Sequence, residues 1–150
     1  MSKAITAVPL FDRLSGVFPP SADGRLLDGV GLQHSLQLDL GRLFNVRNGL
    51  TVREFLDREP SVLHYGLPDT LSLSPNSEFD LQLWAEVLSH CIAAFEPRLS
   101  RVQVSVSADP DKAYGARASI AAAVTVGTQV CRVNFDVALD ASSALLRVAA

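Results

Sequence analysis

Apolar positions recur with helical spacing in the first half of the chain. They predict a helix over residues 32–47, whose buried stripe consists of Leu32, Leu36, Leu40, Leu43 and Phe44. Asn45 is a stop signal for this helix, and Arg47 near its end complements the helix dipole. A shorter helix is expected over residues 52–57, where Pro60 stops it.

The strongest helical pattern covers residues 78–95. Ser77, followed by Asp80, resembles a capping box at its start, and Pro97 disfavours helical geometry at Glu96. The expected core stripe is Leu81, Trp84, Leu88, Cys91, Ile92 and Phe95. Ahead of this helix, residues 65–69 predict an irregular connection and residues 74–77 a polar turn.

After residue 100 the hydrophobic period changes from about 3.6 to about 2 residues, which indicates strands. Alternation is clear over residues 101–106, 120–126 and 131–139. Gly127 and Thr128 predict a hairpin between the last two runs, and residues 109–115 predict a longer loop. Helices followed by an antiparallel meander predict an α+β domain, with the long helix packed on one face of a small sheet.

Frequent glycines and prolines mark the start of the chain. We therefore predict an N-terminal arm at residues 1–31 and a single domain at residues 32–150. Within the arm, Val8, Phe11 and Leu14 recur with helical spacing around Pro9. One or two helical turns there could rest on the chain's own domain or dock onto a partner.

Composition narrows the function classes. The 150 residues are 48% hydrophobic and only 19% charged, and a net charge of −3 offers no basic surface for nucleic acid. No segment has the ~20 strongly apolar residues of a membrane-spanning helix, and we expect no secretory signal. Because charged residues are few, we expect exposed apolar surface on the arm, on residues 118–126 and on the tail. Such surface is typical of a subunit whose neighbours in an assembly cover it.

The sequence offers little chemistry. No two of His34, His64, His90, Cys91 and Cys131 have a recognised metal-ligand spacing, so we expect no metal and no other cofactor. Both cysteines lie on predicted core stripes, and we interpret them as reduced core residues. No nucleophile elbow or phosphate-binding loop occurs, and no catalytic residue is assigned.

Glu96 is the unusual acid. It lies at the C-terminal end of the long predicted helix, where the helix dipole disfavours a negative charge, and Arg98 could offset that cost. Glu96-Pro97-Arg98 is therefore either a salt-bridged stop between helix and strand or a charged surface that faces a partner.

Four motifs, in this order over residues 10–139, resemble the TssE family of type VI secretion baseplates, relatives of the lysozyme-like wedge proteins of contractile phage tails. They are Leu10-Phe11-Asp12-Arg13-Leu14, the helix from Ser35 to Leu43-Phe44-Asn45-Val46-Arg47, Tyr65-Gly66-Leu67-Pro68-Asp69, and Phe95-Glu96-Pro97-Arg98-Leu99. The sequence departs from the family's pattern at Phe44, at Val46 and in the tail 141–150, where relatives often carry another strand.

The resemblance implies a structural, non-enzymatic role in a cytoplasmic, membrane-docked baseplate of a Gram-negative bacterium. Its implied partners are TssF- and TssG-like baseplate subunits, TssB/TssC-like sheath subunits whose assembly it primes, and a TssK-like subunit. Carried over by position, the partner-binding residues are Leu10, Phe11, Arg13, Leu14, Glu96, Pro97 and Arg98. The structural motif residues are Asn45, Arg47, Tyr65, Gly66 and Pro68. An arginine fork suits interface ion pairs, and an open sheet edge can accept a strand.

Two other functions stay open. A lysozyme-like enzyme that degrades peptidoglycan would use Glu96 as general acid, with a second carboxylate about 5–9.5 Å away. The sequence points to no such carboxylate, and Arg98 would favour the ionised form of Glu96. The other alternative is a small adaptor that binds one regulatory protein. The motif details favour a secretion system over a phage-like tail.

Overall fold

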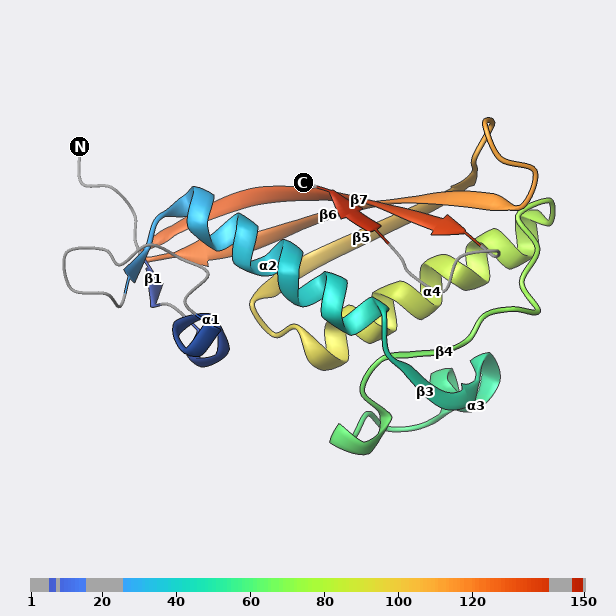
Figure 1. Cartoon of the computed structure of the whole chain (residues 1–150), viewed down its shortest axis with the longest axis horizontal. Coiled ribbons are helices and arrows are strands. Elements are labelled where there is room, and N and C mark those ends of the chain that lie inside the picture. Colours follow the sequence, from blue (N-terminus) through green and yellow to red (C-terminus); the bar gives the residue numbers. More distant parts are fainter. Residues whose placement is uncertain (1–5, 8, 16–25, 141–146, 150) are drawn as a thin grey trace.

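The computed structural model describes residues 6–7, 9–15, 26–140 and 147–149. Its centre is a four-stranded antiparallel sheet with two long helices against one face, and no described element covers the other face (Figure 1). The predicted α+β class, with a long helix packed on a small antiparallel sheet, is confirmed.

The sheet has the strand order β5-β6-β7-β8. The strands are β5 (Leu99–Ala108), β6 (Gly115–Val126), β7 (Gln129–Asp140) and β8 (Arg147–Ala149). The first three are the predicted strands, each longer than expected, and Gly127 at φ +63° turns the predicted hairpin in which Val126 pairs with Gln129. The tail that departs from the family pattern in sequence nevertheless carries a short strand, β8, paired with residues 136–138.

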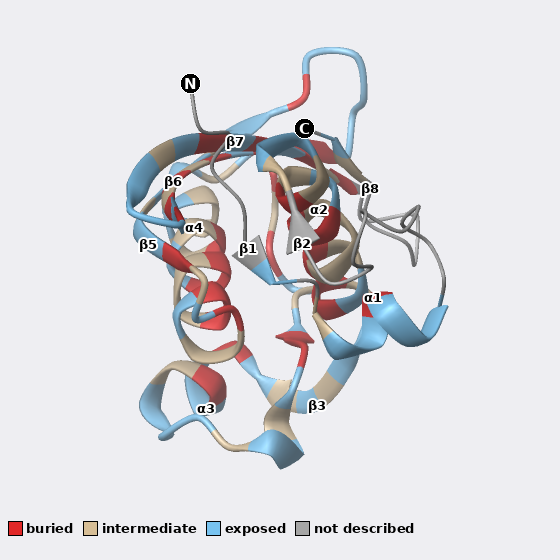
Figure 2. Cartoon of the chain, turned by 90° about the vertical axis from the view of Figure 1, so that its left-hand side faces the viewer, coloured by how far each residue is buried: buried red, intermediate tan, exposed pale blue. Residues whose placement is uncertain are grey.

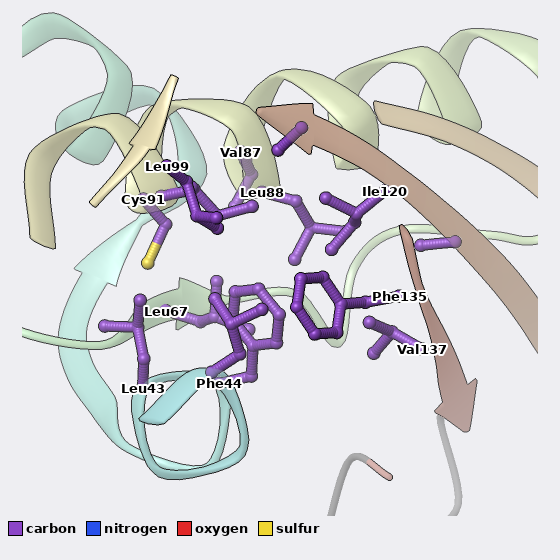
Figure 3. Close-up of a cluster of buried hydrophobic side chains, with 14 of the residues drawn as sticks. Leu43, Phe44, Leu67, Val87, Leu88, Cys91, Leu99, Ile120, Phe135 and Val137 are labelled. Carbon is purple, nitrogen blue, oxygen red and sulfur yellow. The ribbon is translucent and has the colours of Figure 1, made fainter. Parts of the chain in front are cut away.

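Two helices, α2 (Gly29–Phe44) and α4 (Glu78–Phe95), supply the other half of the core. Phe44, Leu88, Ile120 and Phe135 meet between the helices and the sheet, and each is at most 1% exposed (Figure 3). The bounds of α4 are those predicted, and the Ser77 side chain accepts a hydrogen bond from the backbone N–H of Asp80 at 3.3 Å. The capping box does not close, because the Asp80 carboxylate accepts instead from the backbone N–H of Ser74 at 2.9 Å.

Helix α2 begins at Gly29 rather than at residue 32 and ends at Phe44 rather than at residue 47. Asp28 is its N-cap, since the Asp28 side chain accepts a hydrogen bond from the backbone N–H of Gly31 at 2.9 Å. The boundary predicted between arm and domain at residue 31 therefore falls inside α2, and the division itself stays a prediction.

The segment between the two long helices is more regular than predicted. β3 (Arg47–Thr51), α3 (Val52–Asp57), the 3₁₀ helix η1 (Val62–His64) and β4 (Leu67–Asp69) follow one another, and β3 and β4 pair in parallel. The prediction for residues 52–57 is confirmed, with Thr51 and Glu54 forming a capping box. The irregular connection predicted at residues 65–69 was wrong, because β4 finds its ladder partner about twenty residues back along the chain.

Near the N-terminus the structure has β1 (Thr6–Ala7), α1 (Leu10–Ser15) and β2 (Leu26–Leu27), and β1 and β2 are paired antiparallel. The short helix predicted in the arm is present as α1, while Val8 lies outside the described residues. Another surface expected to be bare, residues 118–126, lies entirely within the inner strand β6. Its alternate residues, from Ala118 to Val126, are buried, so only its outer side is exposed.

Candidate functional site

Glu96 and Arg98 lie where helix α4 turns into strand β5. Glu96 is the C-cap residue of α4, and its backbone N–H still donates to the carbonyl of Ile92 at 2.9 Å. The Arg98 guanidinium forms a bidentate pair with the Glu96 carboxylate: Nε donates to Oε1 at 2.7 Å, and Nη2 donates to Oε2 at 2.8 Å. The geometry is thus that of a salt-bridged stop, although Glu96 is only 5% exposed and the pair is not a simple surface bridge.

The same guanidinium reaches helix α2. Arg98 Nη2 donates to Asp39 Oδ2 at 2.6 Å, and Nη1 donates to Ser35 Oγ at 3.2 Å. Burial by itself would lower the pKa of Arg98, but the hydrogen bonds and negative charges of Glu96 and Asp39 outweigh burial and raise that pKa. Arg98 therefore stays charged and connects the end of α4 to the middle of α2.

Helix α1 joins this arrangement through an acid that the sequence analysis missed. Asp12 is 1% exposed, and Ser35 Oγ donates to its Oδ2, while Arg42 Nη1 lies 3.6 Å from its Oδ1. Arg42 also donates to Asp39 at 2.7 Å. We call Asp12, Ser35, Asp39, Arg42, Glu96 and Arg98 the charge cluster.

The charge cluster decides which side of α1 faces the body. The sequence spacing suggested that Phe11 and Leu14 could dock an apolar edge, but they are 75% and 73% exposed. Most of α1 has the colour of exposed residues in Figure 2, and the buried Asp12 makes the contact with α2 instead. Arg13 is also exposed. A signal for this contact exists in the sequence: Ser35, Asp39 and Arg42 recur at helical spacing in a row that flanks the leucine stripe of α2.

The predicted structural motif residues meet at the junction of α2, β3 and β4. Asn45 is the C-cap of α2, and its side chain donates to the carbonyl of Gly41 at 2.7 Å. Arg47 lies in β3 rather than in the helix, yet its Nη1 donates to the Phe44 carbonyl at 2.7 Å, so it still satisfies the helix end. Pro68 is buried in β4.

Gly66 occupies a position that only glycine fits. Its φ is +111°, and a Cβ there would lie 2.4 Å from the carbonyl oxygen of Val46. Its neighbour Tyr65 packs edge-on against Phe95, with ring centroids 5.3 Å apart. Burial raises the pKa of Tyr65, and the negative charge of Asp39 raises it further. Tyr65 is therefore close enough to the charge cluster to interact with it electrostatically.

The described residues offer no evident catalytic or metal centre. No group of three or more His, Cys, Asp or Glu side chains among them could hold a metal ion. Burial raises the pKa of Cys91 to about 12, so its thiol is a poor nucleophile. Cys131 is half-buried and packs against the edge of the core. None of the helices in the described part of the chain has the length and apolar character needed to cross a lipid bilayer.

The sequence matches one protein family over most of its length. The model of the baseplate wedge protein gp25 family matches residues 30–129. The chain belongs to this family. No curated protein sequence matches it. A chain in a solved structure, "The baseplate complex from the type VI secretion system", is 20% identical with a TM-score of 0.53, and the match covers 73% of this chain and 94% of that one. This structural similarity shows a shared fold.

Membership of the gp25 family confirms the resemblance inferred from the motifs and makes the chain a structural baseplate protein. The match includes the charge-cluster residues of α2 and the Glu96–Arg98 turn, together with the β3–β4 junction, while α1 precedes it. The roles assigned to individual residues in partner binding stay predictions.

Proposed function

We propose that this chain is a structural subunit of a type VI secretion baseplate wedge, where it joins TssF- and TssG-like subunits and primes assembly of the contractile sheath. Family membership supports the baseplate role, and the fold shared with a chain of a type VI secretion baseplate complex favours a secretion system over a phage tail. The proposed location is the cytoplasm of a Gram-negative bacterium, at a baseplate docked to the membrane.

The observation that carries the wedge role is how α1 is held. Ser35 and Arg42 on α2 hold Asp12 against the body, and Leu10, Phe11 and Leu14 are 59%, 75% and 73% exposed. An apolar helix side that is held outward by buried polar contacts is a surface that a neighbouring subunit would cover. In this proposal Leu10, Phe11, Arg13 and Leu14 contact a TssF- or TssG-like subunit.

Glu96, Pro97 and Arg98 belong to the same side of the molecule. Ser35 Oγ donates to Asp12 and accepts from Arg98, so two predicted partner-binding segments more than eighty residues apart in the chain share one buried hydroxyl. Pro97 is exposed and available for direct contact, whereas the buried Glu96 acts by fixing Arg98. In this proposal the turn from Glu96 to Arg98 has two roles: Pro97 contacts the partner, and Glu96 holds Arg98 in position.

Sheath priming would use an edge of the sheet. Among the described strands, β5 pairs only with β6, and residues 129–135 of β7 have no partner beyond β6. An unpaired backbone edge can accept a strand from another chain, here a TssB/TssC-like sheath subunit. A TssK-like subunit would complete the set of neighbours.

Co-purification tests this proposal. The tagged chain should bring down TssF- and TssG-like subunits in fixed stoichiometry, and the double variant Phe11→Ser, Leu14→Ser should lose them while keeping its circular dichroism spectrum. Val62→Ser with Leu63→Ser is the matched control, because these side chains are 89% and 84% exposed on η1. Equal recovery of both subunits by the α1 variant would contradict the α1 surface, and recovery of one soluble regulatory protein instead would favour an adaptor.

The peptidoglycan-degrading alternative has less support. Both oxygens of Glu96 accept hydrogen bonds from Arg98, and the side chain is buried, so the carboxyl group is not accessible to a substrate. Clearing of peptidoglycan that is lost in Glu96→Gln would overturn the structural role.

A further inference from the structure

The outer face of the sheet carries a hollow that the proposed wedge contacts do not use. Its lining residues Ala121, Ala123 and Arg132 alternate with residues of β6 and β7 that are buried in the core, so the hollow lies on the face turned away from that core. Its volume is about 260 Å³. Two strand registers place its residues: Ala123 pairs with Arg132 in one row, and Gln103 pairs with Ala121 in the next. The alanines make a low floor, with Arg101 and Arg132 among the residues that line it.

The two arginines in this hollow differ from the third arginine on the same face. Arg117 is engaged, with Nε 3.1 Å from Asp109 and Nη2 3.3 Å from Asp111. Arg101 and Arg132 are exposed, and neither has an ion-pair partner among the described residues. No acidic side chain lines the hollow, so a chain of net charge −3 has a local positive site here.

The backbone at Arg101 is a second, independent observation. Arg101 has φ +50°, the left-handed region that side chains avoid, and the β5–β6 register shifts between Ser100 and Gln103. A bulge of this kind changes the direction in which a side chain points. Non-glycine residues with strained backbone angles are concentrated at functional sites, where their position is required. Glycine would adopt this backbone without strain, yet the position holds an arginine.

We propose that this hollow binds an acidic segment of a partner protein. Two carboxylates of the segment pair with Arg101 and Arg132, while its backbone lies over Ala121 and Ala123, where small side chains permit close approach. An extended peptide fits better than nucleic acid, because the lining has no aromatic ring for a base to stack on and only two cations. The site lies on the sheet face away from the helices, so it is independent of the α1 surface.

A nuclear magnetic resonance titration tests this site directly. The ¹⁵N-labelled chain is titrated with a synthetic peptide of alternating glutamate and serine. Amide shifts should be confined to the rows of Arg101, Gln103, Ala121, Ala123 and Arg132. The matched peptide of alternating lysine and serine should cause none.

Three variants sharpen the titration. Arg101→Gln and Arg132→Gln should each weaken binding of the glutamate peptide by up to about fivefold, the loss of one exposed ion pair. Arg117→Gln, on the same face but already paired, should bind as the unaltered chain does, and all three should keep the dispersed spectrum of a folded domain. Shifts spread over every exposed arginine, an equal loss in Arg117→Gln, or tighter binding of an oligouridylate than of the peptide would overturn the proposal.

Discussion

The two sides of helix α2 hold the molecule together by different means. One side carries Leu36, Leu40 and Phe44, all 0% exposed and packed toward the sheet. The other side carries Ser35, Asp39 and Arg42, which bind Asp12 and Arg98 through hydrogen bonds and ion pairs. One helix therefore belongs to an apolar core and to a polar cluster at the same time.

The two sides of α2 differ in how strictly their interactions depend on the positions of individual side chains. Apolar packing is non-directional and roughly proportional to buried area, so it secures the fold without fixing individual contacts. The charge cluster depends on geometry, because each buried charge is tolerable only while its partners are in place. The core side thus stabilises the domain, and the cluster side decides where α1 and the Glu96–Arg98 turn lie.

The largest effect should come from the core side. Phe44→Ala is expected to lower the free energy of unfolding by about 3–5 kcal/mol, because the ring is fully buried and leaves a cavity. Urea denaturation measures it, with Phe79→Ala as the control, since Phe79 is 72% exposed. An equal loss of unfolding free energy in Phe79→Ala would contradict the view that apolar area buried in this core stabilises the fold.

The second-largest effect should come from a variant in the charge cluster. Glu96→Ala should cost about 3 kcal/mol, because it leaves the partly buried Arg98 with only Asp39 as a charged partner. Asp111→Ala, which breaks the exposed pair with Arg117, should cost at most about 0.5 kcal/mol. A double-mutant cycle between Glu96 and Arg98 measures the coupling, and additive losses would show that the two residues do not act as a unit.

A smaller and more local effect is expected at α1. Asp12→Asn removes the charge that Ser35 and Arg42 bind, and should lower the free energy of opening α1 by about 1–2 kcal/mol. Hydrogen exchange of residues 10–15 measures this opening, while the global unfolding midpoint should change little. Arg13→Gln is the exposed control on the same helix, and equal loss of protection there would contradict a special role for Asp12.

The smallest effect concerns Asp109, an acid in the loop between β5 and β6, outside the charge cluster. A hydrogen bond from the backbone N–H of Asp111, aided by Arg117 and opposed by burial, lowers the pKa of Asp109 in the folded state. The stability that this carboxylate contributes is therefore present above its ordinary pKa of about 4 and lost as pH falls through the lower folded value. Asp109→Asn should flatten the acid limb of the stability–pH curve, and an unchanged limb would contradict this.

Elements governed by local pattern could be predicted from the sequence. The bounds of α3 and α4 and the hairpin at Gly127 agree with the structure because caps, prolines and apolar periodicity are local signals. Strand β4 was missed because Leu67–Asp69 is too short to show a period, and its parallel partner is distant in sequence.

The predicted site was recovered unevenly for the same reason. The motifs pointed to Glu96, Arg98, Tyr65 and Gly66, which lie close to or within the charge cluster and its neighbouring junction. Asp12 was missed because its neighbours Phe11 and Arg13 are exposed, and Ser35, which donates a hydrogen bond to it, lies 23 residues further along the chain.

The sequence by itself determined the fold class, the apolar stripe of each long helix and the alternation of each long strand, because these follow from short-range periodicity. Only the tertiary structure decided that Ser35 lies between Asp12 and Arg98, that β3 and β4 pair, and that Arg101 and Arg132 share one hollow. Such contacts join residues far apart in the chain, and their energy depends on distances that no local pattern encodes.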